Sequence, residues 1–133
     1  MSPRMIYTGI RVKNMNQSLA FYTDILGMEL VEKREDTPPT EGEVAMLKSP
    51  GSEQLLELNW YKEGSRFGTS YVNGSEVDHL GFDVENLDEW ISSLEMKGVK
   101  ILIRPREIGA GVGWNEAFIE DPNGIWIEFL QRK

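Results

Sequence analysis

The sequence predicts an α+β fold made of two tandem βαβββ modules, and three features of the chain point to it. The first is an internal repeat, because at an offset of 72 residues Gly9 matches Gly81 and Val12 matches Val84. The second is that each copy holds short segments with the period-two alternation of strands and one segment with helical spacing. The third is that one side of each predicted strand is almost wholly apolar, which suits a sheet covered by helices on that side.

The first copy predicts a strand, a helix and three further strands, in that order. These elements span residues 5–12, 15–26, 28–33, 44–47 and 54–60. The helix carries an apolar stripe at helical spacing, Asn14 or Asn16 can cap its N-terminus, and Gly27 ends it. An acidic, proline-containing loop over residues 35–42 separates the second and third strands.

The second copy predicts the same order of elements. Its strands span residues 77–84, 99–103, 116–119 and 125–130, and its helix runs from Leu87 to a stop at Gly98. Asn86 or Asp88 can cap this helix. The glycine-rich residues 105–113 predict a loop, and residues 121–124, Asp-Pro-Asn-Gly, predict a tight turn.

The predicted organisation is one domain over residues 1–133. Module one covers about 5–61 and module two about 77–131, and a Gly- and Ser-containing linker over about 62–76 joins them. A chain of 133 residues has the size of a single compact domain.

Composition excludes several classes of function. The formal net charge of −8 argues against nucleic acid and anionic membranes as main partners. The chain has no cysteine, which excludes disulfides, thiolate metal ligands and a cysteine nucleophile. The sequence shows no secretory signal and no apolar run long enough to cross a bilayer, so we expect a soluble cytoplasmic protein.

Four repeat-related positions hold residues that can bind a metal or move a proton. Tyr7 matches His79 at an offset of 72, and Glu57 matches Glu128 at an offset of 71. Period-two alternation places all four on the side of their strands opposite the apolar side, together with Trp126. Because an exposed tryptophan fits poorly on a purely solvated face, we expect a curved, cup-like sheet with the helices on its convex side.

Glu57, His79 and Glu128 would supply two oxygens and one nitrogen to a divalent ion. Two carboxylates held close together in a pocket of low dielectric repel each other, and a dication removes that cost. Each of the three residues alone is more simply a solvated or packing residue of a strand. Their shared face and their places in the repeat favour a metal site.

Several stretches together resemble one protein family over nearly the whole chain. They are Ile10–Val12, Ser18–Thr23, Leu26–Met28, Leu56–Leu58, Asp78–Phe82 and Ala117–Glu128. On these motifs the chain resembles the vicinal oxygen chelate superfamily, and within it most resembles glyoxalase I, lactoylglutathione lyase. The Ser-Leu-Ala-Phe-Tyr segment and the Asp-Pro-Asn-Gly turn are specific to the superfamily and do not fix the activity.

The resemblance implies paired βαβββ modules that form a cup around one divalent metal ion, Ni²⁺ or Zn²⁺ first, with Co²⁺, Mn²⁺ or Mg²⁺ as alternatives. It implies metal ligands at Tyr7, Glu57, His79 and Glu128. Relatives usually carry His or Gln at the first of these positions. Tyr7 therefore either coordinates as a phenolate, hydrogen-bonds to a metal-bound water or leaves that position open.

By the same resemblance, the reaction converts the hemithioacetal of an α-oxo aldehyde and a thiol into a 2-hydroxy thioester through an enediolate. Glu128 would be the catalytic base, with Glu57 as the second choice, and Trp126 would line the substrate pocket. Arg11 matches an arginine expected to bind a substrate carboxylate, and its alternative role is an ordinary ion pair with Asp83.

Three other functions are compared with this one. An epimerase resembling methylmalonyl-CoA epimerase would use a similar metal and a glutamate base. A ring-cleaving dioxygenase would need two histidines, and the chain has one. A protein resembling the bleomycin-resistance proteins would use the same cup to sequester a small molecule without catalysis. The resemblance also implies a homodimer in which each cup combines module one of one chain with module two of the other.

Overall fold

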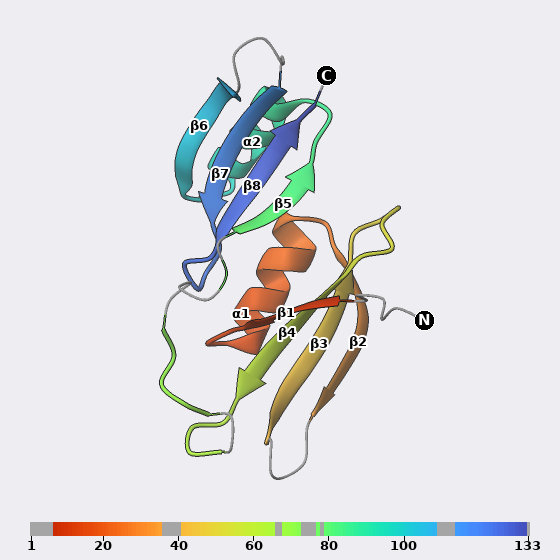
Figure 1. The fold of residues 1–133 in the computed structure, drawn as a ribbon, viewed down its shortest axis with the longest axis vertical. Helices are drawn as coiled ribbons and strands as arrows, with labels where there is room; N and C mark the ends of the chain where they lie inside the picture. Colours follow the sequence, from red (N-terminus) through yellow and green to blue (C-terminus); the bar gives the residue numbers. More distant parts are fainter. Residues whose placement is uncertain are drawn as a thin grey trace, which may run out of the picture. The chain divides into compact units, whose positions relative to one another are not determined.

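The computed structural model describes residues 7–35, 41–65, 68–72, 77, 79–108 and 114–132. The chain divides into two compact units, Met1–Val72 and Asn73–Lys133. In chain order the described elements are β1 (Tyr7–Arg11), α1 (Met15–Ala20), η1 (Phe21–Ile25), β2 (Glu29–Glu35), β3 (Gly42–Lys48), β4 (Leu55–Tyr61), β5 (His79–Asp83), α2 (Leu87–Met96), β6 (Ile101–Ile108), β7 (Trp114–Glu120) and β8 (Trp126–Gln131). Figure 1 shows these elements along the chain.

Each unit contains one four-stranded mixed sheet with the same topology. The strand order is β1-β4-β3-β2 in the first unit and β5-β8-β7-β6 in the second. In each sheet the first strand runs parallel to its neighbour, and the other neighbours are antiparallel. The predicted α+β class with two βαβββ modules is therefore confirmed.

The strand registers preserve the repeat seen in the sequence. In the first unit Gly9 of β1 lies beside Glu57 of β4. In the second unit Gly81 of β5 lies beside Glu128 of β8. The two glutamates therefore occupy equivalent places in two sheets of the same design.

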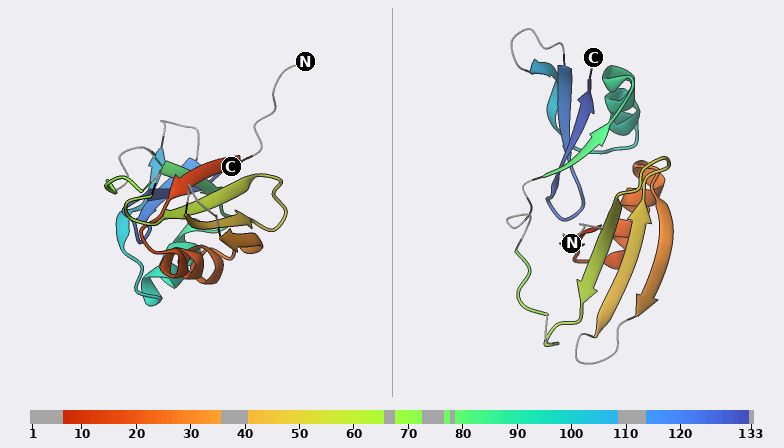
Figure 2. Two further views of the ribbon diagram at one scale, coloured as in Figure 1. Left: turned by 90° about the horizontal axis from the view of Figure 1, so that it is seen from below. Right: turned by 45° about the vertical axis from the view of Figure 1, so that its right-hand side comes forward.

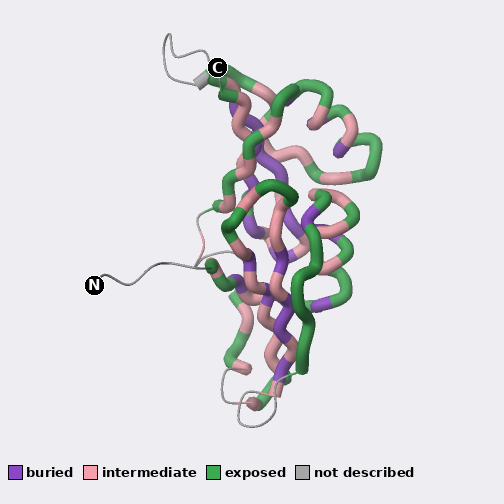
Figure 3. Tube along the Cα trace, turned by 90° about the vertical axis from the view of Figure 1, so that its right-hand side faces the viewer, coloured by how far each residue is buried: buried purple, intermediate pink, exposed green. Residues whose placement is uncertain are grey.

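One face of each sheet forms the core against a helix. On β8 the side chains of Ile127 and Phe129 are buried, and the Phe129 ring meets the Trp90 ring of α2 edge to face, with centroids 5.6 Å apart. On β4 Leu56 and Leu58 are buried, and α1 packs against this strand. Figure 2 shows α2 along one face of its sheet, and Figure 3 shows where buried positions lie along the strands. The intervening residues of β4 and β8 therefore lie on the opposite faces, as the alternation predicts.

The helices begin at the asparagines that the repeat relates to each other. The Asn14 side chain accepts a hydrogen bond from the backbone N–H of Gln17 at 2.9 Å, and that of Asn86 accepts one from Glu89 at 3.1 Å. These are N-caps, so the alternatives Asn16 and Asp88 are wrong. No helix within the described residues is long and apolar enough to cross a membrane.

The predicted turn before the last strand is confirmed. The carboxylate of Asp121 is buried and accepts hydrogen bonds from the backbone N–H groups of Asn123 at 2.8 Å and Ile125 at 2.7 Å. Gly124 has a φ of 86°, a left-handed conformation that glycine adopts without strain. This turn sets the register of β7 against β8.

The prediction of a loop over residues 105–113 is wrong for its first part, because β6 continues to Ile108. Pro105 does not end the strand because β6 lies at the edge of its sheet, where a residue without a backbone N–H is tolerated. The pairing of β6 with β7 shifts register on either side of Ile103. Residues 109–113 lie outside the described residues.

Candidate functional site

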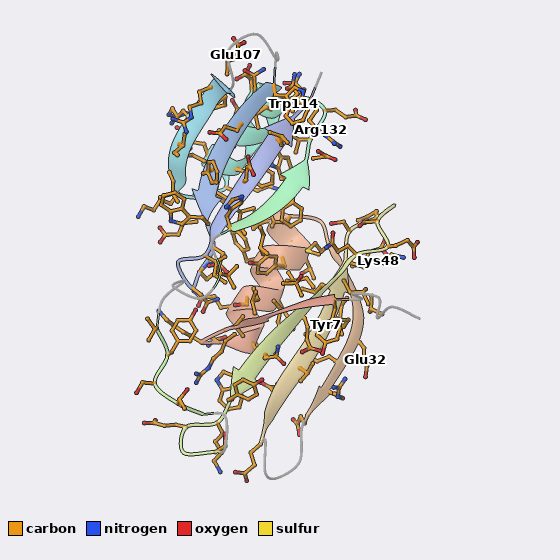
Figure 4. All side chains as sticks on the ribbon, in the orientation of Figure 1. Tyr7, Glu32, Lys48, Glu107, Trp114 and Arg132 are labelled. Atoms are coloured by element: carbon orange, nitrogen blue, oxygen red, sulfur yellow. The ribbon has the colours of Figure 1, made fainter. Side chains whose placement is uncertain are left out.

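In the first unit, the side chains of Tyr7 and Glu57 lie close to Gly9. A methyl group at Gly9 would lie 3.6 Å from Oε1 of Glu57, 3.9 Å from Cε2 of Tyr7 and 3.4 Å from Nδ2 of Asn59. Tyr7, on β1, is 42% exposed (Figure 4). The structure therefore brings the predicted phenol and carboxylate to the same small region of one sheet face.

In the second unit, His79 and Glu128 are in direct contact. Nε2 of His79 lies 3.2 Å from Oε2 of Glu128, and the two side chains are 37% and 18% exposed. A methyl group at Gly81 would lie 3.9 Å from the same glutamate oxygen. A nitrogen donor and an oxygen donor thus meet on a partly accessible face, with no side chain at residue 81 to cover them.

Aromatic rings line the face beside this pair. The ring of Phe118 lies edge to face against His79, with centroids 5.6 Å apart, and against Trp126 at 5.8 Å. The predicted pocket residue Trp126 is 45% exposed on this face. Phe118 was not predicted as a site residue, and the register of β7 with β8 places it directly opposite Glu128.

Arg11 lies in a pocket of its own unit. Its guanidinium Nη1 donates to Oγ1 of Thr69 at 3.0 Å, Nη2 donates to the Thr69 carbonyl, and the rings of Tyr61 and Tyr71 lie 5.6 and 5.9 Å away. These residues help to line a cavity of about 330 Å³. A segment that the sequence assigned to the linker therefore contributes contacts to a predicted substrate-binding residue.

Asp83, the alternative partner of Arg11, has a different partner. Its carboxylate accepts a hydrogen bond from Nη2 of Arg132, the residue after β8 (Figure 4). The contacts that the structure gives Arg11 are those with Thr69 and the two tyrosine rings. They leave its role as a substrate-binding residue a prediction.

Comparison with known proteins places the chain in a family. Residues 4–129 match the model of the Glyoxalase/Bleomycin resistance protein/Dioxygenase superfamily. The chain belongs to this superfamily. Lactoylglutathione lyase of Salmonella typhimurium is 32% identical to it, with 98% of this chain and 93% of the relative covered. The lactoylglutathione lyase of Neisseria meningitidis is 33% identical over 98% of this chain and 91% of its own length.

Solved structures of the superfamily agree with the fold. The trypanothione-dependent glyoxalase I of Leishmania major has a TM-score of 0.74 and is 31% identical, with 98% of this chain and 87% of that chain covered. Glyoxalase I of Zea mays has a TM-score of 0.78 and is 26% identical, with 97% of this chain and 44% of that chain covered. The paired βαβββ architecture is therefore that of a glyoxalase.

This member of the superfamily divides the four predicted ligands equally between its units. Tyr7 and Glu57 lie in the first unit, and His79 and Glu128 lie in the second. Within the described residues, no three His, Asp or Glu side chains gather closely enough to hold a metal ion. The structure thus brings the two residues of each pair close together within their own unit, and their role as metal ligands stays a prediction.

Proposed function

We propose that the chain is a metal-dependent lyase that isomerises the hemithioacetal of an α-oxo aldehyde and a thiol into a 2-hydroxy thioester. The observation that carries the proposal is the contact between His79 and Glu128, on a strand pair whose counterpart in module one presents Glu57. The full-length similarity to lactoylglutathione lyases supports this reaction rather than another of the superfamily.

The proposed metal ligands are Glu57, His79 and Glu128, with Tyr7 at or near the fourth position. The donor set and the spacing in module two fit a divalent ion such as Ni²⁺ or Zn²⁺. Two ligand atoms, each about 2.1 Å from one cation, lie roughly 3.0–3.4 Å apart at octahedral or tetrahedral angles. The separation of 3.2 Å between His79 Nε2 and Glu128 Oε2 lies in this range.

When bound, the cation supplies Lewis-acid stabilisation of negative charge on two neighbouring oxygens of the substrate. In our proposal Glu128 accepts the proton from the carbon that bears sulfur and returns it to the adjacent carbon. The hydroxyl proton moves to the oxygen of that adjacent carbon, so the reaction is an isomerisation that needs no oxidant. Glu57 is the alternative base.

Other residues of the same faces would bind and shield the substrate. Phe118 and Trp126 give an apolar wall beside Glu128, which limits the access of water to the deprotonated substrate. Arg11 would bind a carboxylate of the thiol part in exchange for its hydrogen bonds to Thr69.

A direct assay tests the proposal. Protein purified without chelator is loaded with Ni²⁺ or Zn²⁺ and mixed with methylglyoxal and glutathione, and thioester formation is followed by its ultraviolet absorbance. We expect turnover that disappears when the metal is removed and returns when it is restored. Turnover that is equal in metal-free protein, or no turnover with any thiol and any of the divalent ions named above, would refute the proposal.

Sequestration of a small molecule is the second candidate, and the tyrosine at position 7 favours it. Tyr7 replaces the usual His or Gln of catalytic relatives, and a phenol is a weak ligand for these dications until it is deprotonated. Under this alternative the purified protein contains no stoichiometric metal and binds aromatic or thiol-containing molecules without converting them. Metal analysis together with the assay above separates the two functions.

A further inference from the structure

A buried carboxylate holds an exposed guanidinium on the second sheet. Nε and Nη2 of Arg106 both donate to Oε2 of Glu116, at 2.9 and 2.8 Å. The Glu116 side chain is 11% exposed and that of Arg106 is 59% exposed. The carboxylate is therefore almost enclosed, while much of the guanidinium is accessible to solvent.

Register places this ion pair on the same face as the proposed catalytic residues. Arg106 of β6 lies opposite Glu116 of β7, and Phe118, two residues further along β7, lies opposite Glu128 of β8. Cross-strand partners point to the same side of a sheet, as do residues two apart in one strand. The ring contact between Phe118 and His79 confirms which side this is.

The register shift after Ile103 explains why Arg106 points to this face. In a regular strand Arg104 and Arg106 would point the same way. Instead Nη2 of Arg104 bonds Oε1 of Glu95 on α2 at 2.8 Å, which places Arg104 on the helix side. The irregularity between Ile103 and Arg106 turns the strand between the two arginines, an effect typical of β-bulges.

The ion pair is better explained by recognition than by stability. Glu116 lies at the start of a buried run that continues through Ala117, Phe118 and Ile119. Burying a charge among apolar residues offsets most of the gain from pairing it, so such pairs add little stability. Glu116 instead holds the guanidinium of Arg106 in one orientation. The remaining N–H groups of Arg106 then face solvent in the planar arrangement that suits a carboxylate.

We propose that Arg106 binds a carboxylate in the thiol part of the substrate and that Glu116 positions it. The location of the reacting carbons rests on the function proposed above. Two strand spacings and two residues along the sheet separate the Cα atoms of Arg106 and Glu128 by about 12 Å. The residue therefore selects thiols whose carboxylate lies well away from the sulfur.

Binding of an unreactive analogue tests the proposal without depending on turnover. The probes are S-methylglutathione and its diethyl ester, and the dissociation constants are measured by calorimetry on the metal-loaded protein. We expect the wild-type chain to prefer the acid. In Arg106→Gln we expect the ratio of the two constants to fall by about tenfold or more, the contribution typical of one charged hydrogen-bonding group.

Arg104→Gln is the matched control. It removes the same charge from the same strand and breaks an ion pair of similar length, but on the helix side. The preference for the acid should be unchanged in this variant. Arg106→Gln leaves the buried Glu116 carboxylate without its partner, and the double variant Arg106→Gln/Glu116→Gln removes that carboxylate. The double variant should lose the preference for the acid to the same extent as Arg106→Gln. It therefore replaces the single variant in the test if the single variant unfolds.

Glu116→Gln tests the positioning role. We expect KM for the acid substrate to rise while kcat stays unchanged, because the guanidinium loses its orientation and not its charge. A purely structural role would lower the melting temperature without changing the preference for acid over ester.

The proposal is overturned if the wild type shows no preference for the acid, or if Arg106→Gln keeps it. These outcomes are separable from failure of the proposed function. If Arg106→Gln loses the preference for the acid but the wild type never isomerises a hemithioacetal, only the proposed reaction is disproved. If the wild type and Arg106→Gln both isomerise the hemithioacetal with the same KM, only the inference about Arg106 is disproved.

Discussion

Residue 9 has no side chain, and the space this leaves is lined by the acid and the phenol of module one. A methyl group there would make ordinary van der Waals contacts with Glu57, Tyr7 and Asn59. A methyl group at Gly42 would instead lie 2.2 Å from the carbonyl oxygen of Trp60. Gly42 therefore has no room for a side chain, whereas Gly9 has room for a methyl group beside Glu57 and Tyr7.

We predict that Gly9→Ala lowers metal affinity and activity without loss of stability, because the added methyl group fills space beside the Glu57 carboxylate while alanine suits a strand better than glycine. The free energy of unfolding, measured by urea titration, should stay within about 1 kcal/mol of the wild type. Gly42→Ala should instead destabilise the chain by about 1–3 kcal/mol, because the backbone must move. Equal metal affinity in Gly9→Ala and the wild type would contradict the assignment of Glu57.

Glu128→Gln should lower kcat by about a hundredfold or more, the usual contribution of a general base. The fold should persist, because the substitution keeps the size of a partly accessible side chain. Glu120→Gln is the control, since Glu120 lies on the neighbouring strand and pairs with Lys100 at 3.0 Å. If both variants retain full activity, Glu128 is not the base.

At the scale of the elements, the two helices depend on equivalent asparagine caps. Asn14→Ala should lower the free energy of unfolding by about 1 kcal/mol, because it leaves a backbone N–H at the start of α1 without its partner. Asn16 is the second residue of α1, two residues after the cap. Asn16→Ala should therefore change the free energy of unfolding by less than about 0.5 kcal/mol. Urea unfolding of both variants checks the cap, and equal losses would contradict it.

Most elements could be predicted from the sequence because periodicity and turn residues act locally. The alternation of Ile127 and Phe129 with Glu128 already fixes which side of β8 faces the helix. The choice between Asn14 and Asn16 could not be made, because both have the right chemistry and only backbone geometry separates them. The end of β6 was missed because a proline such as Pro105 usually ends a strand. A proline is tolerated in a strand at the edge of a sheet, and the sequence does not show which strand lies at the edge.

The site could be predicted only in parts. The period of the side chains gives the face of each strand, so the side on which Glu57, His79 and Glu128 lie could be predicted from the repeat. The contacts of Arg11 with Thr69 come from a segment without periodicity. Arg106 was missed because residues 105–113 were predicted to form a loop. Simple alternation along a longer strand would also have placed Arg106 on the same side as Arg104, because it does not foresee the register shift.

At the scale of the whole molecule, we propose that the chain forms a homodimer with sites shared between chains. The prediction is tested by mixing two inactive variants, Glu57→Gln and Glu128→Gln, after denaturation and refolding together. If each site combines module one of one chain with module two of the other, mixed dimers contain one intact site. About a quarter of wild-type activity should then return.

Sites built within one chain would give no recovery in this mixture. Co-refolding Glu57→Gln with itself is the control and should stay inactive. Sedimentation or light scattering should report a dimer mass for each protein, and a monomer that retains metal would contradict the shared-site arrangement.

The proposed site requires that residues of both modules bind one cation. The measurement that tests it most directly is a calorimetric titration of the metal-free protein with Ni²⁺, repeated on Glu57→Gln and His79→Gln. We expect one ion per wild-type chain and an affinity at least tenfold weaker in each variant, because each replaces a charged or imidazole ligand by an amide, which is at best a weaker ligand for these ions. Binding that is unchanged by the loss of Glu57, or absent from the wild type with every dication tried, would contradict the shared metal site.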